Sequence, residues 1–257
     1  MNSKTWRALL AAISVAVSMP AAMADTKKPL TPQEQEIRKA VEQVVSNPDI
    51  IDSVTKTSYG NFYEVVLTNG DILYVEPNGG FLISGSLVDI KAKRNVTADR
   101  LKELSQINFT DLPLANAIKQ VKGNGKRVLV TFEDPNCSYC KKLARELVSI
   151  KDATIYTFLI PILSPNGDSA EKSKAIWCAP DRAKAWNDWM VDNKMPVGGS
   201  KACDTPIAKN MDLQKRFRIN GTPTMFFVDG SRLGGYAPPA ELERLIAEAT
   251  DKVALKK

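Results

Sequence analysis

The chain has 257 residues, a formal net charge of +6 and four cysteines, and it contains no histidine. Its basic residues are interleaved with acidic ones, which is typical of a solvated surface and argues against a nucleic-acid site. The lack of histidine excludes covalent c-type haem, which needs a histidine directly after a Cys-x-x-Cys pair.

Residues 1–24 have the pattern of a secretory signal peptide. Lys4 and Arg7 precede an apolar stretch over 8–19, and an Ala-x-Ala site predicts cleavage after Ala24. A membrane anchor is the alternative, but this apolar stretch is shorter than the roughly 20 residues that span a bilayer. We therefore expect an exported protein without stable membrane insertion, in an oxidising compartment where disulfides persist.

Residues 25–92 are predicted to form a small domain with one helix and a short antiparallel sheet. Thr31 and Glu34 have the spacing of a capping box, and Pro32 suits the first turn of a helix. Strand-like runs separated by Asn-Gly turns follow at 62–67, 72–76 and 81–90. The core of so short a unit is thin, so we expect this domain to dimerise.

Residues 93–112 are predicted to be a helical connector, and residues 113–257 a larger domain that mixes helices and strands. Its expected elements, in chain order, are a helix at 114–122, a strand at 127–132, a helix through 140–148, a strand at 154–160, a helical region over 168–217, hairpin strands at 225–228 and 232–236, and a helix at 241–249.

The stretch EDPNCSYCKK (133–142) places Cys137 and Cys140 where a buried strand leads into a helix. Residues at this spacing on a helix lie about 5–6 Å apart, within the separation that a disulfide tolerates. Free backbone amides at the helix start favour a thiolate at Cys137, while Cys140 should be more buried. A purely structural pair would close too short a loop to stabilise the fold much. Zinc would need a second close ligand pair, so we expect no metal and no cofactor.

A second informative stretch is Gly221-Thr222-Pro223-Thr224, directly before an apolar strand. Proline cannot donate a hydrogen bond to a sheet, so Pro223 should lie at the first residue of the strand or in a cis turn.

Several stretches of residues 25–257 resemble the DsbC/DsbG family of periplasmic disulfide isomerases: FEDPNCSYCKKL, KAIWCAPD, NGTPTMFFVDG, GGYAPP, VLTNGDILYV and NVTADRLKEL. The resemblance implies an α+β protein with a cystatin-like N-terminal dimerisation domain, a helical linker and a C-terminal thioredoxin-like domain with a helical insertion. It also implies a V-shaped homodimer whose two catalytic domains face a cleft.

The resemblance further implies roles for individual residues. Cys137 would be the nucleophile, Cys140 the resolving cysteine, and Thr222 and Pro223 a cis-proline loop that, with the intervening Ser138-Tyr139, contacts substrate. This chain departs from the pattern at two positions. Ser138 stands where the best-known isomerase of the family has glycine, and Thr131 occupies the position, six residues before the nucleophile, where thioredoxin-fold enzymes often bury an acid. Glu133 and Asp134 lie nearby, but the sequence does not orient them.

The expected function is therefore disulfide isomerisation in the periplasm, without a cofactor. Misoxidised exported proteins would be the substrates, and a membrane thiol reductase of the DsbD type would keep the enzyme reduced. The alternatives are a DsbG-like reductase of sulfenylated cysteines and a chaperone that binds unfolded chains.

Cys178 and Cys203 both lie in the predicted helical insertion, and we expect them to form a structural disulfide. Two buried free thiols are the alternative.

Overall fold

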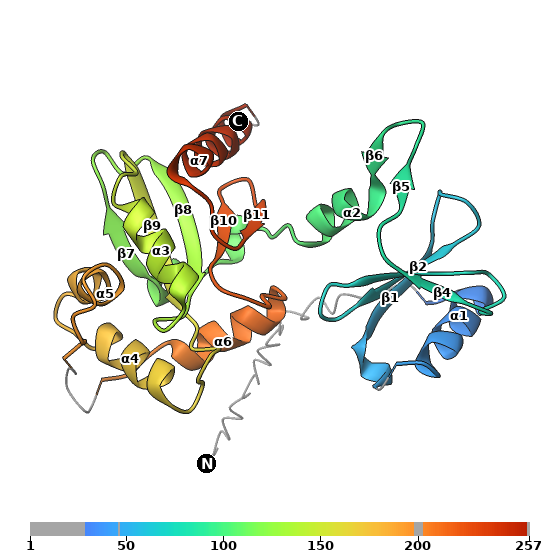
Figure 1. Ribbon diagram of the computed structural model, residues 1–257, viewed down its shortest axis with the longest axis horizontal. Coiled ribbons are helices and arrows are strands. Elements are labelled where there is room, and N and C mark those ends of the chain that lie inside the picture. Colours follow the sequence, from blue (N-terminus) through green and yellow to red (C-terminus); the bar gives the residue numbers. More distant parts are fainter. Residues whose placement is uncertain (1–28, 46, 198–202, 256–257) are drawn as a thin grey trace, which may run out of the picture.

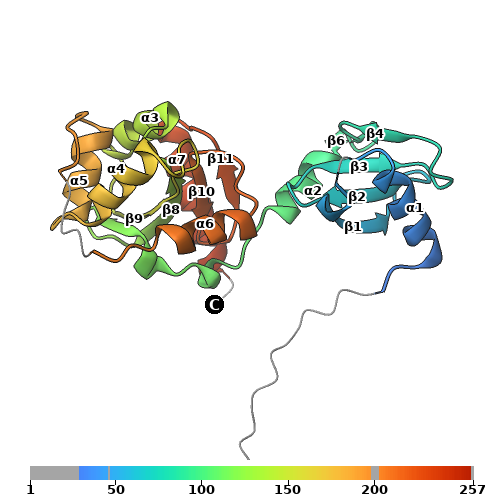
Figure 2. The ribbon, with the colours of Figure 1, turned by 90° about the horizontal axis from the view of Figure 1, so that it is seen from below.

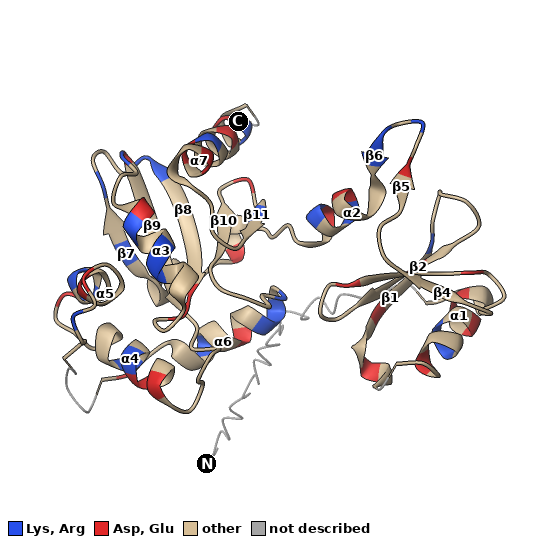
Figure 3. Cartoon of the chain, in the orientation of Figure 1, with Lys and Arg blue, Asp and Glu red and all other residues tan. Residues whose placement is uncertain are grey.

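A computed structural model describes residues 29–45, 47–197 and 203–255, in two bodies joined by a narrow connection (Figure 1). The predicted signal peptide lies outside these residues. Among the helices of the described ranges, none is long and apolar enough to cross a bilayer. Basic and acidic residues are interspersed over both bodies (Figure 3).

The N-terminal domain is one helix packed across a four-stranded antiparallel sheet. Its strands follow the order β1-β2-β3-β4. Its elements are α1 (Pro32–Glu42), the 3-10 turn η1 (Pro48–Ile50), β1 (Ile51–Lys56), β2 (Tyr63–Leu67), β3 (Ile72–Val75) and β4 (Leu82–Ser84). Thr31 and Glu34 form both hydrogen bonds of the predicted capping box. Ile37 and Val41 then bury one face of α1 against the sheet.

Two features of this domain differ from the sequence-based expectation. Strand β1 was not predicted, because its sequence IDSVTK is mostly polar, as suits a strand at the edge of a sheet. The single strand expected at 81–90 is divided at Gly85: β4 ends at Ser84, and β5 (Val88–Asp89) pairs instead with β6 (Arg94–Asn95). Glycine inside a strand weakens it, because it has no side chain to pack.

The connector is divided between the two domains. Helix α2 (Val96–Leu104) packs on the second face of the N-terminal sheet, where Leu104 contacts the cluster around Tyr74 and the Tyr74 hydroxyl lies 2.6 Å from Thr97 Oγ1. The following turns, η2 (Phe109–Asp111) and η3 (Leu114–Asn116), contribute to the core of the C-terminal domain.

The C-terminal domain contains a five-stranded mixed sheet with the order β11-β10-β8-β9-β7. Strands β8 and β9 are parallel and connected through α3, while β7, β10 and β11 run antiparallel to their neighbours. The elements are β7 (Ile118–Val121), β8 (Arg127–Glu133), α3 (Ser138–Leu147), β9 (Ala153–Leu159), α4 (Asp168–Trp177), α5 (Arg182–Met190), α6 (Ile207–Arg216), β10 (Thr224–Phe227), β11 (Arg232–Gly234) and α7 (Pro239–Ala254).

Helices cover both faces of this sheet (Figure 2). Residues of α3 and α7 pack on the face that carries Leu129 and Met225, and α6 packs on the opposite face around stacked Phe132 and Phe158. Helices α4 and α5 belong to the insertion between β9 and β10 and form a third cluster with α3. This is the arrangement expected of a thioredoxin-like domain with a helical insertion.

The helix predicted at 114–122 is wrong. The structure has the short turn η3 followed by strand β7, which pairs with β9 from Ile118 to Val121. Apolar residues at Leu114, Ala117, Ile118 and Val121 fit a helical spacing, and this misled the sequence-based assignment. Pairing with the free edge of β9 satisfies the backbone groups of this segment, and this tertiary contact outweighs a weak helical pattern.

Candidate active site

The Cys-x-x-Cys pair lies at the junction of β8 and α3. Cys137 is the N-cap of α3, and its Sγ accepts a hydrogen bond from the backbone N–H of Cys140 at 3.3 Å. Cys137 is 7% exposed and Cys140 is fully buried, while Ser138 and Tyr139 between them are exposed to solvent. A substrate can therefore reach the outer cysteine and the intervening pair, but not the inner cysteine.

The two thiols also differ in pKa. The pKa of Cys137 is lowered to about 6, chiefly by a hydrogen bond from the Cys140 side chain, with further contributions from Thr222 and the backbone amides of Cys140 and Tyr139, against the opposing effect of burial. Burial raises the pKa of Cys140 far above its usual range. At neutral pH, Cys137 is thus mainly a thiolate and Cys140 a thiol.

Residues 221–224 form a second loop, which lies beside Cys137 although it comes much later in the sequence. The Thr222–Pro223 peptide bond is cis, Pro223 is buried, and β10 begins at Thr224. The Sγ of Cys137 lies 3.3 Å from the Thr222 carbonyl oxygen, to which the thiol form donates. The fold therefore brings together Cys137, Cys140, Thr222 and Pro223, as the resemblance implies.

The loop before Cys137 is fixed by side-chain contacts that the sequence analysis did not predict. The Asp134 carboxylate accepts hydrogen bonds from the backbone N–H groups of Asn136 and Leu163 at 2.7 and 2.9 Å, and from the Ser169 hydroxyl at 3.0 Å. The Trp189 indole donates to the Pro135 carbonyl at 2.6 Å. Ser169 and Trp189 belong to α4 and α5, so the helical insertion supports the nucleophile, which no local sequence signal could show.

Glu133, the last residue of β8, is buried within the same domain. Neither of its carboxylate oxygens has a hydrogen-bond partner among the described residues. Burial raises the pKa of Glu133 to about 8, opposed by the nearby Thr131 hydroxyl and reinforced by the negative charge of the Cys137 thiolate. The Thr131 hydroxyl donates to Thr157 and forms no hydrogen bond of normal geometry with Glu133. In the register of the sheet, Glu133 lies beside Leu159 of strand β9. Leu159 packs in the cluster that contains both cysteines.

Thr131 points to the same face of β8 as Glu133, and its hydroxyl donates to Thr157 Oγ1 at 3.0 Å. The usual position of the buried acid is therefore taken by a satisfied hydroxyl. The buried acid of this chain, Glu133, lies two residues further along β8 than Thr131. It is therefore on the same face of the strand. Strand alternation could have signalled this, had the end of β8 been assigned correctly.

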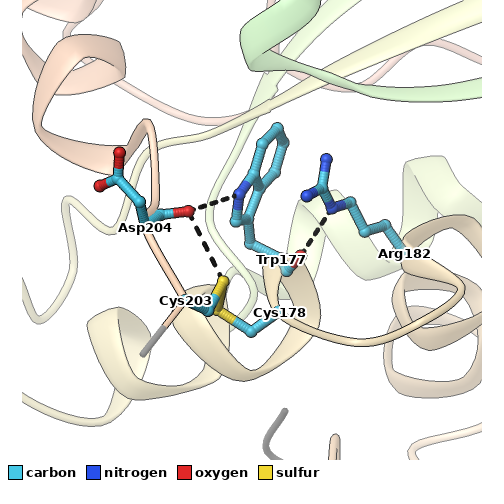
Figure 4. The surroundings of a disulfide bond; sticks show 5 residues. All are labelled: Trp177, Cys178, Arg182, Cys203 and Asp204. Atoms are coloured by element: carbon cyan, nitrogen blue, oxygen red, sulfur yellow. Dashed lines mark hydrogen bonds between the residues drawn. A yellow bond between two sulfur atoms is a disulfide. The ribbon is translucent and has the colours of Figure 1, made fainter. Parts of the chain in front are cut away.

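Cys178 and Cys203 form a disulfide with a Cα–Cα distance of 5.8 Å, which is the predicted pairing. The bridge joins the end of α4 to the segment before α6 (Figure 4). Beside it, the Trp177 indole donates to the Asp204 carbonyl at 3.2 Å, and the Arg182 guanidinium lies 3.8 Å from the Trp177 ring centroid. The enclosed loop includes α5, which carries Trp189.

Replacing Cys178 and Cys203 together with alanine should lower the free energy of unfolding by about 3–4 kcal/mol, because the unfolded chain would no longer be restrained over this loop of 25 residues. Urea unfolding of wild type and variant, both with Cys137 and Cys140 reduced, measures the difference. Peptide mapping of the unreduced wild-type protein that recovered both cysteines as free thiols would contradict the assignment.

No group of three or more histidine, cysteine, aspartate or glutamate side chains is placed to hold a metal within the part of the chain that the structure describes.

Comparisons with known proteins match both domains of the chain. Residues 28–98 match the disulfide bond isomerase protein N-terminal domain, and residues 114–250 match a thioredoxin-like domain. The "Probable thiol:disulfide interchange protein DsbC" of Bordetella parapertussis is 42% identical over 212 residues, covering 82% of this chain and 74% of the relative. The thiol:disulfide interchange protein DsbC of Escherichia coli K12 is 27% identical over 211 residues, which cover 81% of this chain and 87% of that relative.

Among solved structures, a disulfide interchange protein from Neisseria gonorrhoeae is 46% identical and superimposes with a TM-score of 0.51, covering 54% of this chain and 98% of that one. The family follows from two observations: both domains match known domain families, and the chain is 42% identical to the Bordetella parapertussis relative over most of its length. The chain belongs to the DsbC family of thiol:disulfide interchange proteins.

Proposed function

We propose that this protein rearranges incorrect disulfides in exported proteins, with Cys137 as the attacking thiolate and Cys140 as the resolving thiol. The observation that carries this assignment is the contrast between the two cysteines. Cys137 caps a helix start, keeps a small exposed fraction and has its pKa lowered to about 6, whereas Cys140 is fully buried with its pKa raised. A nucleophile must be ionised and accessible, and only Cys137 is both.

The reaction begins when the Cys137 thiolate attacks one sulfur of a substrate disulfide. The substrate S–S bond breaks, a mixed disulfide forms, and the other substrate sulfur leaves as a thiolate. If that thiolate attacks another substrate disulfide, and a later substrate thiolate releases Cys137, the substrate is isomerised with no net change in electrons. If Cys140 attacks Cys137 instead, the substrate leaves reduced, and Cys137 and Cys140 become a disulfide.

Glu133 is suited to accept the proton of Cys140 in this second route. Burial chiefly raises the pKa values of Glu133 and Cys140, and the negative charge of the Cys137 thiolate adds to this effect. Formation of the mixed disulfide removes that charge. Both pKa values then fall, which favours the carboxylate form of Glu133 at the stage when a second thiolate is needed.

Thr222 and Pro223, with the exposed dipeptide Ser138-Tyr139, border the accessible side of Cys137. Tyr139 is 61% exposed and offers an aromatic surface beside the thiolate. We assign these four residues to substrate binding, because an extended peptide whose disulfide approaches Cys137 must pass between them.

The N-terminal domain should pair with a second copy of the chain. Apolar side chains are exposed on and around its edge strand β4, namely Phe81, Ile83, Val88 and Ile90. Such a strand can pair across a two-fold axis and bury these side chains, which a small domain with a thin core would otherwise leave in water.

Replacing Ile83 with glutamate should convert a dimer at micromolar concentration into a monomer, because β4 would carry a charge into the proposed interface. Sedimentation velocity measures the change. Val121→Glu is the matched control, since Val121 is also an exposed apolar residue on an edge strand but belongs to the C-terminal domain. A wild-type chain that sediments as a monomer would exclude the dimer.

Reduction of substrates leaves Cys137 and Cys140 oxidised, so continued turnover needs two electrons from outside. In the periplasm, where the predicted signal peptide would deliver the chain, a membrane reductase of the DsbD type is the partner that we propose. Accordingly, Cys137 and Cys140 should be found mainly as thiols in the cell.

Reactivation of a protein with scrambled disulfides, measured beside reduction of a cysteine sulfenic acid by the same preparation, tests the proposal. We expect catalysed reactivation that Cys137→Ala abolishes. Efficient sulfenic-acid reduction without reactivation would favour the DsbG-like alternative. Prevention of aggregation that survives Cys137→Ala, again without reactivation, would favour the chaperone.

A further inference from the structure

The two domains contact each other directly, beside the active-site loop. Arg218 Nη2 donates to Asp52 Oδ2 at 2.6 Å, and Asn220 Nδ2 donates to the Asn69 carbonyl oxygen at 2.7 Å. Asp52 lies on strand β1, and Asn69 lies in the turn between β2 and β3. In Figure 1, the end of α6 faces this edge of the N-terminal sheet. We call these four residues the interdomain clasp.

The two clasp residues of the C-terminal domain, Arg218 and Asn220, lie in a segment that its own domain holds in place. Ile219, between Arg218 and Asn220, is fully buried, and its N–H donates to the Gln214 carbonyl at 2.9 Å. Arg232 donates to the carbonyl oxygens of Phe217 and Arg218 at 3.2 and 3.1 Å. Arg218 has a φ of 51°, in the left-handed region that residues other than glycine rarely adopt. This turn directs the Arg218 side chain toward the N-terminal domain.

The clasp also adjoins the loop that contacts the nucleophile. Asn220 is separated from Thr222 only by Gly221. Thr222 in turn places its carbonyl oxygen 3.3 Å from Cys137 Sγ. Displacement of Asn220 would therefore shift the backbone at Thr222, two residues along the chain.

We propose that the interdomain clasp makes the N-terminal domain a positioning element of the active site, which holds the loop before cis-Pro223 in place against Cys137. The role depends on the proposed function of Cys137 as the nucleophile. Arg218 and Asn220 act through Thr222 and are positioning residues rather than catalytic ones.

The geometry of the contact explains why two polar interactions would matter. Asp52 and Arg218 have side chains only 24% and 26% exposed, so their charges are partly shielded from water. Beside them, the domains are separated by an open cavity of about 360 Å³, lined by residues that include Leu101, Phe217 and Arg232. Apolar packing does not seal this part of the interface, so the clasp should weaken as salt screens its ion pair.

A charge-reversal cycle tests the clasp in the whole chain. Arg218→Asp places two carboxylates together, and aspartate tolerates the left-handed conformation of this position. Asp52→Arg places two guanidinium groups together, and the double variant restores an ion pair of opposite polarity. The readouts are the alkylation rate of reduced Cys137 by iodoacetamide at neutral pH and the hydrogen exchange of amides 217–224. Neither readout requires isomerase activity.

We expect each single reversal to slow alkylation at least about twofold and to speed exchange in this segment. Displacement of Thr222 would weaken the hydrogen bond of its side chain, which favours the Cys137 thiolate. The double reversal should return both readouts toward wild type. Asp49→Asn removes an exposed carboxylate three residues from Asp52 and is the matched control, which should change neither. Wild-type alkylation and exchange in both single reversals would overturn the proposal, whatever the isomerase assay gives.

Discussion

Replacing Cys140 with alanine should turn the protein into a trap for its substrates. Cys140→Ala removes the side-chain hydrogen bond that chiefly lowers the Cys137 pKa, so less Cys137 would be ionised at neutral pH. Cys137 would still attack a substrate disulfide, because Thr222 and the backbone amides that favour its thiolate are retained. The mixed disulfide would lose its internal route of release, since no thiol would remain behind Cys137. Non-reducing gels of periplasmic extract should therefore show covalent complexes that disappear on reduction.

Cys137→Ala is the matched variant, and it should form no such complexes and lose all isomerase activity. Cys140 alone cannot replace the nucleophile, because it is fully buried and its pKa is raised far above neutral. Complexes formed by Cys137→Ala at the level of Cys140→Ala would reverse the two roles.

Replacing Glu133 with glutamine should slow the release of substrate by Cys140 roughly 10²-fold, the lower range for loss of a positioned proton acceptor. Attack by Cys137 should change little, because that thiol is already ionised near neutral pH. Single-turnover experiments with a small disulfide separate the two steps. Glu133→Asp, which keeps a carboxyl group, should recover part of the release rate, whereas a purely structural role would give no such recovery.

The same substitution should change the dependence of stability on pH. The carboxyl group of Glu133 has an ordinary pKa of about 4.5 in the unfolded chain and about 8 in the folded protein. Between these values the folded state binds the additional proton, so this group makes stability fall as pH rises through that window. At pH 7, this group has lowered the free energy of unfolding by about 3 kcal/mol relative to its value below pH 4.5.

Unfolding in urea at pH 5 and pH 8 should accordingly show a smaller loss of stability for Glu133→Gln than for wild type. The glutamine amide is buried without a partner in the Glu133→Gln variant, but the cost of this burial is the same at both pH values. It therefore cancels when the stabilities at pH 5 and pH 8 are compared within each protein. An unchanged pH dependence would mean that Glu133 is not the buried, high-pKa group described here.

Much of the active site could be predicted from sequence because its determinants are local. The Cys-x-x-Cys spacing after an apolar strand predicts a helix start whose second cysteine is more buried than the first. In the structure Cys137 is the N-cap of α3 and 7% exposed, and Cys140 is fully buried. Thr31 and Glu34 likewise form their capping box within one turn of chain. Such features depend on neighbours a few residues apart, so the sequence contains them.

Tertiary structure alone decided the features that depend on distant neighbours. Segment 118–121 became a strand because β9 offered a free edge, although its apolar spacing suited a helix. Glu133 became a buried acid because β8 extends one residue beyond its apolar run and pairs there with Leu159 of β9. The neighbouring Asp134 instead accepts hydrogen bonds from three donors. The contact of Arg218 with Asp52 joins residues 166 positions apart. Desolvation and long-range pairing depend on which surfaces the fold brings together, and no local pattern in the sequence specifies them.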